Sequence, residues 1–277
     1  MKMKKPKLST ILIYLFLLFL VFVYVAPLLW MVMVSFKTNK ELVSAPFAIP
    51  EIFHRENYIA AWTKGKLGRA LLNSAIVCTT SLVLSVVIGT MAAFSIGTMK
   101  WKYSKAAMLY ILVGMMVPIH CILIPLYKGI SGVGLADNLI GLIIPYTVFS
   151  LPITIYIMTG FFESLPKELF EAACIDGCSI YKCFFSVGVP LTKTGLFVVG
   201  LMSFIGNWNE LLCAVVFLSS DTKKTMPVSL AKFAGPHATN YVQQFAAIVI
   251  AVLPTVVVYC CFSNQIVDGL TQGAVKG

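Results

Sequence analysis

Charged side chains are scarce in this sequence, because Asp, Glu, Lys and Arg together make up only 12% of its 277 residues. A soluble domain of this length carries about twice that fraction. Hydrophobic residues account for 59% of the chain, and the mean hydropathy is +0.90. The composition therefore excludes an ordinary soluble domain and indicates a membrane protein. The net charge of +10 does not indicate a nucleic-acid partner, because lysines commonly flank the apolar helices of membrane proteins.

The sequence also lacks the residue patterns of an ATPase, a hydrolase or a metal protein. No G-x-x-x-x-G-K-[ST] phosphate-binding loop is present, so the energy for any transport must come from an ion gradient or a partner. His54, His120 and His237 are far apart in the sequence and have no acidic partner at a useful spacing. The eight cysteines lack the paired spacing of a zinc site, and we interpret them as small apolar fillers. We therefore predict no catalytic residue, no metal and no cofactor.

The sequence does contain long runs of apolar residues. Each of six runs reaches the roughly 20 residues that a helix needs to cross the hydrocarbon core of a bilayer. Helices are predicted there because the backbone must satisfy its own hydrogen bonds in lipid. The predicted spans cover residues 11–35, 70–99, 106–127, 138–162, 194–220 and 238–267, and Glu210 alone interrupts the fifth run with a charge. The predicted fold class is an all-α membrane protein with six transmembrane helices.

The first run follows the basic segment MKMKKPK, an arrangement that is also typical of a secretory signal peptide. This run is longer than a signal core and has no cleavage site in register, so we predict an uncleaved span, with a cleaved signal as the alternative. Six spans place both termini on one side of the membrane. Lys and Arg divide almost evenly between the two sides, 11 against 10, but the basic residues before the first span favour a cytoplasmic amino terminus.

A charged insert, PKELFEAACIDGCSIYKCFFSVGVPL at residues 166–191, separates the fourth and fifth predicted spans. Pro166 predicts the first turn of a helix, and Gly177 predicts the left-handed position that ends it. Ser179 predicts the cap of a second short helix, and Pro190 marks the turn into the next span. We therefore expect a helix–turn–helix that is too short to fold alone and that another protein can bind.

This insert is similar to the EAA loop of ABC importer permeases, in which E-A-A, three residues and Gly are followed, nine residues later, by Ile-x-Leu-Pro. The matching residues are Glu171, Ala172, Ala173, Gly177 and Pro190, whereas Val187 and Val189 stand where Ile and Leu are usual. In that family the loop docks on the ATP-binding subunit and couples ATP hydrolysis to the membrane gate. The resemblance implies that the loop at 163–193 and both termini are cytoplasmic. It implies ATPase coupling by Glu171, Ala172, Ala173, Asp176, Gly177 and Pro190.

The resemblance extends over almost the whole chain. APLLWMVMVSFK (26–37), WNELLCAVVFL (208–218) and GLTQGAVKG (269–277) are similar to the carbohydrate-uptake branch, in particular the smaller permease of maltose-type importers. The resemblance implies a type I ABC importer permease fold in the bacterial cytoplasmic membrane. Residues 1–69 would form a tail, the first span and an outer loop, residues 70–267 the transmembrane core, and residues 268–277 a cytoplasmic tail.

The resemblance also implies a non-catalytic subunit that works with partners. These are two copies of an ATP-binding subunit, a second permease and an extracytoplasmic sugar-binding protein that meets the outer loops at 36–69 and 221–237. The first outer loop mixes proline, aromatic and charged residues, so we expect short helices in it, with one candidate at residues 51–62. The implied substrate is a sugar or an oligosaccharide, and no nucleic acid is expected.

A polar group lies in the fifth predicted span: Asn207, Trp208, Asn209 and Glu210. An ionisable side chain at membrane depth is costly and marks a candidate functional site. Asn and Trp side chains suit hydrogen bonding to and stacking on a sugar, whereas the alternative is that the group only holds neighbouring helices together. A second function class, an ion-coupled carrier or channel without an ATPase, needs a relay of titratable groups and has no use for the charged insert. We therefore predict an importer permease.

Overall fold

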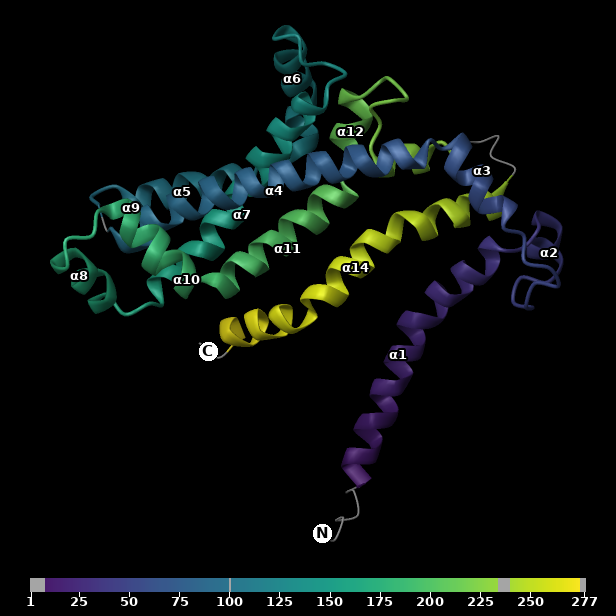
Figure 1. Ribbon diagram of the computed structural model, residues 1–277, viewed down its shortest axis with the longest axis horizontal. Helices are drawn as coiled ribbons and strands as arrows, with labels where there is room; N and C mark the ends of the chain where they lie inside the picture. Colours follow the sequence, from purple (N-terminus) through teal and green to yellow (C-terminus); the bar gives the residue numbers. More distant parts are fainter. Residues whose placement is uncertain (1–7, 100, 234–239, 275–277) are drawn as a thin grey trace. The chain divides into compact units, whose positions relative to one another are not determined.

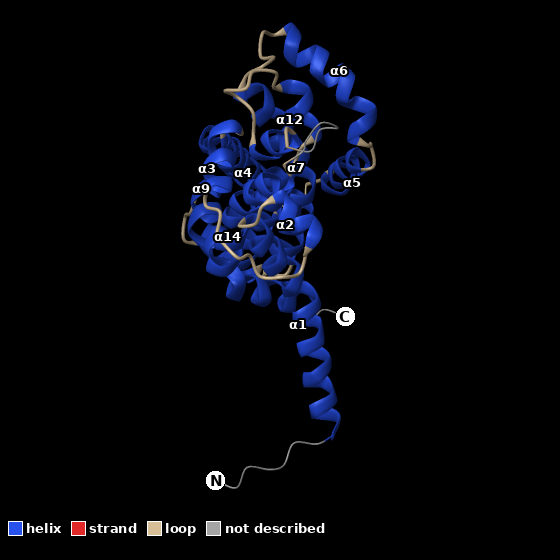
Figure 2. Ribbon diagram, turned by 90° about the vertical axis from the view of Figure 1, so that its right-hand side faces the viewer, coloured by secondary structure: helices blue, strands red, loops and turns tan. Residues whose placement is uncertain are grey.

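The computed structural model describes residues 8–99, 101–233 and 240–274, and every regular element in these ranges is a helix (Figures 1 and 2). Four helices are long and apolar enough to cross a membrane, and two bent helix pairs raise the number of candidate spans to as many as six. The four are α1 (Leu8–Ser35), α4 (Leu67–Thr98), α7 (Leu139–Glu163) and, over residues 241–262, α14 (Tyr241–Ala274). The predicted all-α membrane class is confirmed.

The third predicted span is not one straight helix. It consists of α5 (Ser104–Met115) and α6 (Ile119–Gly132), which are bent by 95° at their junction. Pro118 lies in the break, where its ring and its missing N–H prevent continuation of the helix. The segment predicted as one span over 106–127 therefore contains two helices.

The fifth and sixth predicted spans also need correction. The fifth ends early: α11 (Lys193–Asn209) is followed by Glu210 in an extended conformation and then by the short α12 (Leu212–Phe217). The sixth runs past its predicted end at residue 267, because α14 continues to Ala274. Its predicted start at residue 238 lies outside the described residues.

The chain divides into two compact units, Met1–Leu67 with Leu230–Leu253, and Gly68–Ser229 with Pro254–Gly277. The first unit contains the expected short helices of the outer loop, α2 (Asn39–Ser44) and α3 (Glu56–Lys64). In the second unit, α8 (Glu168–Ile175) and α9 (Ile180–Cys183) lie at the left end of α4 in Figure 1, and α6 lies beside α12.

In the first unit, Lys37 organises the segment after α1. Its side chain is 1% exposed, and its Nζ donates to the carbonyls of Ala45 (2.7 Å) and Pro46 (3.3 Å), just past the end of α2. Carbonyls at a helix C-terminus carry partial negative charge, which favours a cation there. Asn57 of α3 donates to the carbonyls of Ser35 and Lys37. These bonds fold the outer loop back onto the end of α1.

In the second unit, α4 and α7 approach each other closely. A Cβ atom added to Gly89 of α4 would lie only 2.6 Å from the Thr154 side chain of α7. Small residues permit this close packing, which van der Waals contact drives inside a membrane. Buried hydroxyl side chains follow the same two helices: Ser81, Ser85 and Thr90 on α4, and Thr147, Ser150 and Thr154 on α7.

Candidate coupling loop, polar helix break and outer clamp

The predicted helix–turn–helix is present as α8 and α9. Gly177 has a φ of +75°, and its N–H donates to the carbonyl of Cys174 at 3.0 Å. The N–H of Cys178 donates to the carbonyl of Ala173, also at 3.0 Å, so the two bonds form a Schellman motif. The Ser179 hydroxyl accepts the N–H of Lys182 and caps α9. The predicted glycine end and serine cap are both confirmed.

Two prolines of this segment lie elsewhere than predicted. Helix α8 begins at Glu168, so Pro166 precedes its cap residue instead of occupying the first turn. After α9 the chain continues through a π-helical turn, η1 (Phe184–Gly188), into α10 (Val189–Leu191), which contains Pro190. Pro190 is tolerated because it lies in the first turn of α10, where an N–H is not required. The 79° change of direction follows α10, between the segments 180–191 and 193–209.

An aromatic cluster ties the loop to the long helices. The Phe94 ring of α4 contacts Phe162 of α7 at 5.4 Å, Phe170 of α8 at 5.6 Å and Phe184 of η1 at 5.4 Å between centroids, each at a steep angle. Such edge-to-face pairs contribute about 0.5–1.5 kcal/mol each beyond the burial of their area. A Cβ atom at Gly188 would lie 3.2 Å from the Phe162 ring, so the η1 backbone also packs against this cluster. Both α8 and η1 therefore pack directly against α4, and η1 also packs against α7.

The face of the loop that points away from this cluster is exposed. Among the predicted coupling residues, Glu171, Ala172, Asp176, Gly177 and Pro190 are exposed, whereas Ala173 is buried. Exposed apolar side chains accompany them, including Leu169, Ile175, Ile180 and Tyr181. Apolar side chains gathered among charges are typical of a protein interaction site. A pocket of about 360 Å³ opens at the base of this surface, with Gly97, Thr98, Glu163, Lys167 and Glu171 in its wall.

The polar group predicted inside the fifth span lies at a helix break instead. Glu210 follows the last residue of α11, and its carboxylate accepts the Tyr146 hydroxyl at 2.6 Å. It also accepts the N–H groups of Cys213 (2.8 Å) and Ala214 (3.2 Å) in the first turn of α12. The placement of Glu210 along a continuous helix was wrong. At the break, the first N–H groups of α12 have no acceptor within the helix, and the Glu210 carboxylate accepts two of them. Its negative charge is also favoured at the positive end of the helix dipole.

The other three residues of this group have different surroundings. Trp208 is 4% exposed and stacks on Phe204 at 5.5 Å. Asn207 is buried, with its Oδ1 3.5 Å from the Ser150 hydroxyl, and its Nδ2 has no hydrogen-bond partner among the described residues. Asn209 is exposed and donates to the carbonyl of Ile205. Only Asn209 among the four therefore presents an exposed side chain.

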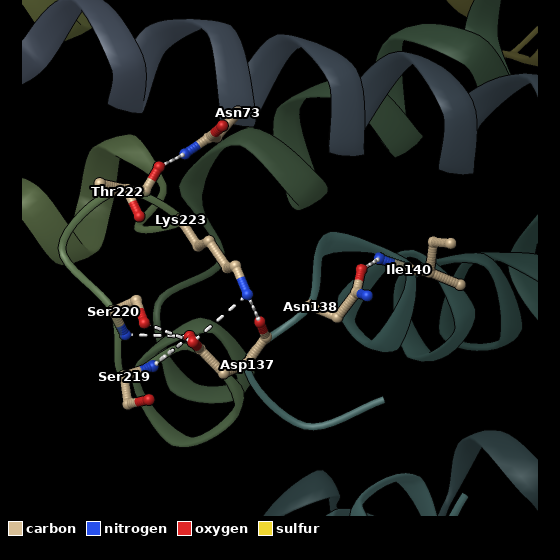
Figure 3. A network of polar contacts seen from close by, with 8 residues as sticks. All are labelled: Asn73, Asp137, Asn138, Ile140, Ser219, Ser220, Thr222 and Lys223. Atoms are coloured by element: carbon tan, nitrogen blue, oxygen red, sulfur yellow. Dashed lines mark hydrogen bonds and ion pairs between the residues drawn. The ribbon is translucent and has the colours of Figure 1, made fainter. Parts of the chain in front are cut away.

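Sequence reasoning missed a second polar cluster, which we call the outer clamp, formed by Asp137, Ser219, Ser220 and Lys223 (Figure 3). Asp137 has a φ of +50° and accepts the N–H groups of Ser219 (3.0 Å) and Ser220 (2.9 Å), the Ser220 hydroxyl and the Lys223 ammonium. The Ser220 hydroxyl, followed by the backbone N–H groups and the charge of Lys223, lowers the pKa of Asp137 to about 2. The carboxylate is therefore charged throughout the physiological pH range.

The loop that Asp137 holds is also bound to α4. Asn73 donates from Nδ2 to the carbonyls of Thr222 and Lys224, both at 3.0 Å. Asn73 and Phe94 are 21 residues apart on α4, or roughly 30 Å at about 1.5 Å per residue. That separation matches the roughly 30 Å hydrocarbon core. The loop that contains Thr222 and Lys224 and the helix α8 thus contact α4 at points about one membrane thickness apart.

We expect Asp137→Ala to release residues 218–225 from this clamp. The variant removes the acceptor of several charge-assisted hydrogen bonds, each of which contributes about 1.5–3 kcal/mol. Hydrogen–deuterium exchange of the segment should therefore accelerate at least tenfold. Asp221→Asn is the matched control, because Asp221 pairs with Lys224 on the exposed surface of the same loop and exposed pairs contribute little. Equal exchange in Asp137→Ala and the unmodified protein would contradict the clamp.

Residues 85–270 match the family described as "Binding-protein-dependent transport system inner membrane component". The diacetylchitobiose uptake system permease protein NgcG of Streptomyces coelicolor is 34% identical over 256 residues, which are 92% of this chain and 85% of that protein. The trehalose/maltose transport system permease protein MalG of Thermococcus litoralis is 30% identical over 278 residues, 99% of this chain and 100% of that protein.

A solved structure supports the fold. A chain in the crystal structure of a bacterial ABC transporter involved in the import of the acidic polysaccharide alginate superimposes with a TM-score of 0.80. The match covers 95% of this chain and 99% of that chain, at 21% sequence identity. This chain therefore shares the fold of a chain of that transporter.

Proposed function

The chain belongs to the family of binding-protein-dependent transport system inner membrane components, and on this premise we propose that it is the permease subunit of an ATP-driven importer of sugars or oligosaccharides. Relatives that span most of the chain are named for the uptake of diacetylchitobiose and of trehalose or maltose, which supports this substrate class. An ion-coupled carrier has no support from the family.

The observation that carries the proposal is the exposed, firmly anchored loop at 163–193. One face of the loop exposes Glu171, Asp176 and apolar side chains, whereas the opposite face packs in the aromatic cluster around Phe94. This loop would dock on an ATP-binding subunit, present in two copies, and transmit its movement to α4 and α7. The loop and both termini would then lie in the cytoplasm of a bacterial cell, and ATP hydrolysis would belong to the partner.

We further propose that a second permease completes the translocation path, and that an extracytoplasmic sugar-binding protein delivers the substrate. The outer loops at 36–69 and 221–237 would meet that protein, and residues 234–237 of the second loop lie outside the described part of the chain. Residues 70–267 would form the transmembrane core, with 1–69 and 268–277 as flanking segments. The outer clamp supports this arrangement, because it anchors Ser219 and Ser220 at the start of the second of these loops.

Co-purification combined with Glu171→Lys tests the proposal. The unmodified chain should purify with a second permease and a subunit that contains a phosphate-binding loop. Glu171→Lys puts a cation on the exposed coupling face, so we expect at least a tenfold loss of the bound ATP-binding subunit and of uptake, with an unchanged amount of chain in the membrane. Glu168→Lys makes the same charge change on the same helix outside the predicted coupling residues, and it should retain both. Normal association in Glu171→Lys would refute this docking surface.

We also propose that Asn207, Trp208, Asn209 and Glu210 form part of the substrate path, with the exposed Asn209 meeting the sugar and the other three supporting it. Asn209→Ala should raise the KM of uptake several-fold without changing the amount of assembled complex, since it removes a hydrogen-bonding group from the path. Ile205→Ala, one turn earlier and also exposed, is the matched control. Trp208→Ala should instead reduce assembly. An unchanged KM in Asn209→Ala would remove these residues from the path.

A further inference from the structure

An exposed apolar surface covers the end of α2 and the loop that follows it in the first unit. We call residues 43–53 the apolar segment. Its large apolar side chains, which are 61–81% exposed, are Val43, Phe47, Ile49, Ile52 and Phe53. A patch of this kind marks a contact with another protein or with a membrane.

The apolar segment is bound to the end of α1. The Trp30 indole of α1 donates from Nε1 to the carbonyl of Pro46 at 2.9 Å, and the rings of Trp30 and Phe47 are 6.1 Å apart between centroids. Trp30 lies five residues before the end of α1 at Ser35, or about 7.5 Å along the helix axis. Phe47 therefore lies beside a residue that is still within the membrane-spanning helix, and it remains 80% exposed.

The length of α1 gives the depth of this contact. Its 28 residues extend about 42 Å, which matches the roughly 40–45 Å of a bilayer with both headgroup layers. Counted inward from Ser35, the pair Trp30 and Phe47 then lies at the boundary between headgroups and hydrocarbon. Tryptophan is enriched at this boundary, because its ring is apolar and its N–H is polar.

Polar groups of the apolar segment and its surroundings are satisfied within the chain. The buried Lys37 ammonium donates to the carbonyls of Ala45 and Pro46, and the N–H of Ala45 donates to the carbonyl of Glu41. A polar group without a hydrogen bond is costly to transfer out of water. These bonds remove part of that cost, so the segment can enter a less polar environment with its apolar side chains outward.

We propose that the apolar segment lies in the membrane interface at the Ser35 end of α1 and is covered by phospholipid. It continues the exposed apolar surface of α1, for which lipid is the surrounding solvent. Lipid is present throughout a transport cycle, whereas a binding protein that delivers substrate and leaves would return Phe47 and Ile49 to water in every cycle. The proposed sugar-binding protein would then meet α3 and the second outer loop. This inference does not depend on the transported substrate.

Thiol labelling tests the depth of the segment. Trypsin releases residues 41–55, which contain no native cysteine, so a cysteine introduced there is followed by its own peptide. In membranes opened to both sides by freeze–thawing, we expect a water-soluble maleimide to modify Phe47→Cys at least tenfold more slowly than Glu51→Cys. Both positions are exposed in the chain itself, and each rate is divided by that of the same variant in sodium dodecyl sulfate. Equal normalised rates would overturn the proposal.

Photochemical cross-linking identifies what covers the segment. Benzoylphenylalanine in place of Phe47, in vesicles that contain the assembled transporter, should add the mass of a phospholipid to peptide 41–55 on irradiation. The same residue in place of Glu56, whose side chain is 80% exposed at the start of α3, is the control and should acquire no lipid. A cross-link from position 47 to the second permease or to a sugar-binding protein, or no cross-link at all, would overturn the proposal. Vesicles that lack ATP-dependent sugar uptake would refute the proposed function instead, because the lipid adduct forms without transport.

Discussion

Replacing Gly177 with proline should abolish uptake while the amount of chain in the membrane stays normal. Gly177 has a φ of +75°, whereas proline fixes φ near −65°. Proline also removes the N–H that donates to the carbonyl of Cys174, and it pushes the preceding Asp176 away from its observed ψ of 8° toward an extended conformation. The Schellman turn therefore cannot form, α8 loses its position relative to α9, and we expect uptake to fall at least a hundredfold.

Gly177→Asn is the matched control for this variant. Asparagine tolerates a left-handed conformation, and a Cβ atom at this position would meet no other atom within 4 Å. We therefore expect Gly177→Asn to retain at least half of the uptake, measured per amount of chain in the membrane. Normal uptake in Gly177→Pro would show that the turn between α8 and α9 has no role in coupling.

Glu210→Ala should prevent assembly of the protein. The variant leaves the N–H groups of Cys213 and Ala214 without their acceptor at a break between helices. The Tyr146 hydroxyl loses its 2.6 Å bond to the carboxylate and keeps only the Glu210 carbonyl at 3.3 Å. Each unsatisfied buried donor costs about 1–3 kcal/mol. The summed cost approaches the whole free energy of unfolding of a typical domain. We expect a thermal midpoint at least 10 °C lower in detergent, and little assembled complex in membranes.

Glu210→Gln separates the role of the charge from that of the hydrogen bonds. Glutamine keeps one acceptor oxygen, so the loss of stability should be clearly smaller than in Glu210→Ala. Tyr146→Phe removes one of the three donors, and the double variant Tyr146→Phe with Glu210→Ala should be less destabilised than the sum of the single variants. Strict additivity would show that the two side chains do not interact.

The class of this protein follows from its sequence because the bilayer imposes local requirements. Each span needs about 20 apolar residues in a row, and a window of sequence reveals such a run without knowledge of the fold. The turn at Gly177 and the cap at Ser179 were predictable for the same reason, since their hydrogen bonds join residues at most five positions apart. The helix–turn–helix of α8 and α9 was therefore correctly predicted in outline before its packing was known.

Prolines show where such local reasoning ends. Pro145 and Pro152 lie within α7 and do not end this helix. By contrast, the chain bends by 95° at Pro118, and Pro190 lies in the short α10. The residue type is the same in all four cases. The outcome depends on whether neighbouring helices, side chains or π-helical turns satisfy the backbone groups that a proline frees. That information is not present in the window around each proline.

The sequence by itself determined the membrane class, the approximate spans and the position of the loop that carries Glu171 and Gly177, because these depend on composition and on short-range hydrogen bonds. Only the tertiary structure decided what Glu210 and Asp137 do. Glu210 binds a hydroxyl 64 residues away, and Asp137 holds a loop 82 residues away. Such pairs form because distant segments of the chain pack side by side: Glu210 accepts N–H groups of the buried Cys213 and Ala214, and Asp137 accepts the N–H groups of a partly exposed loop.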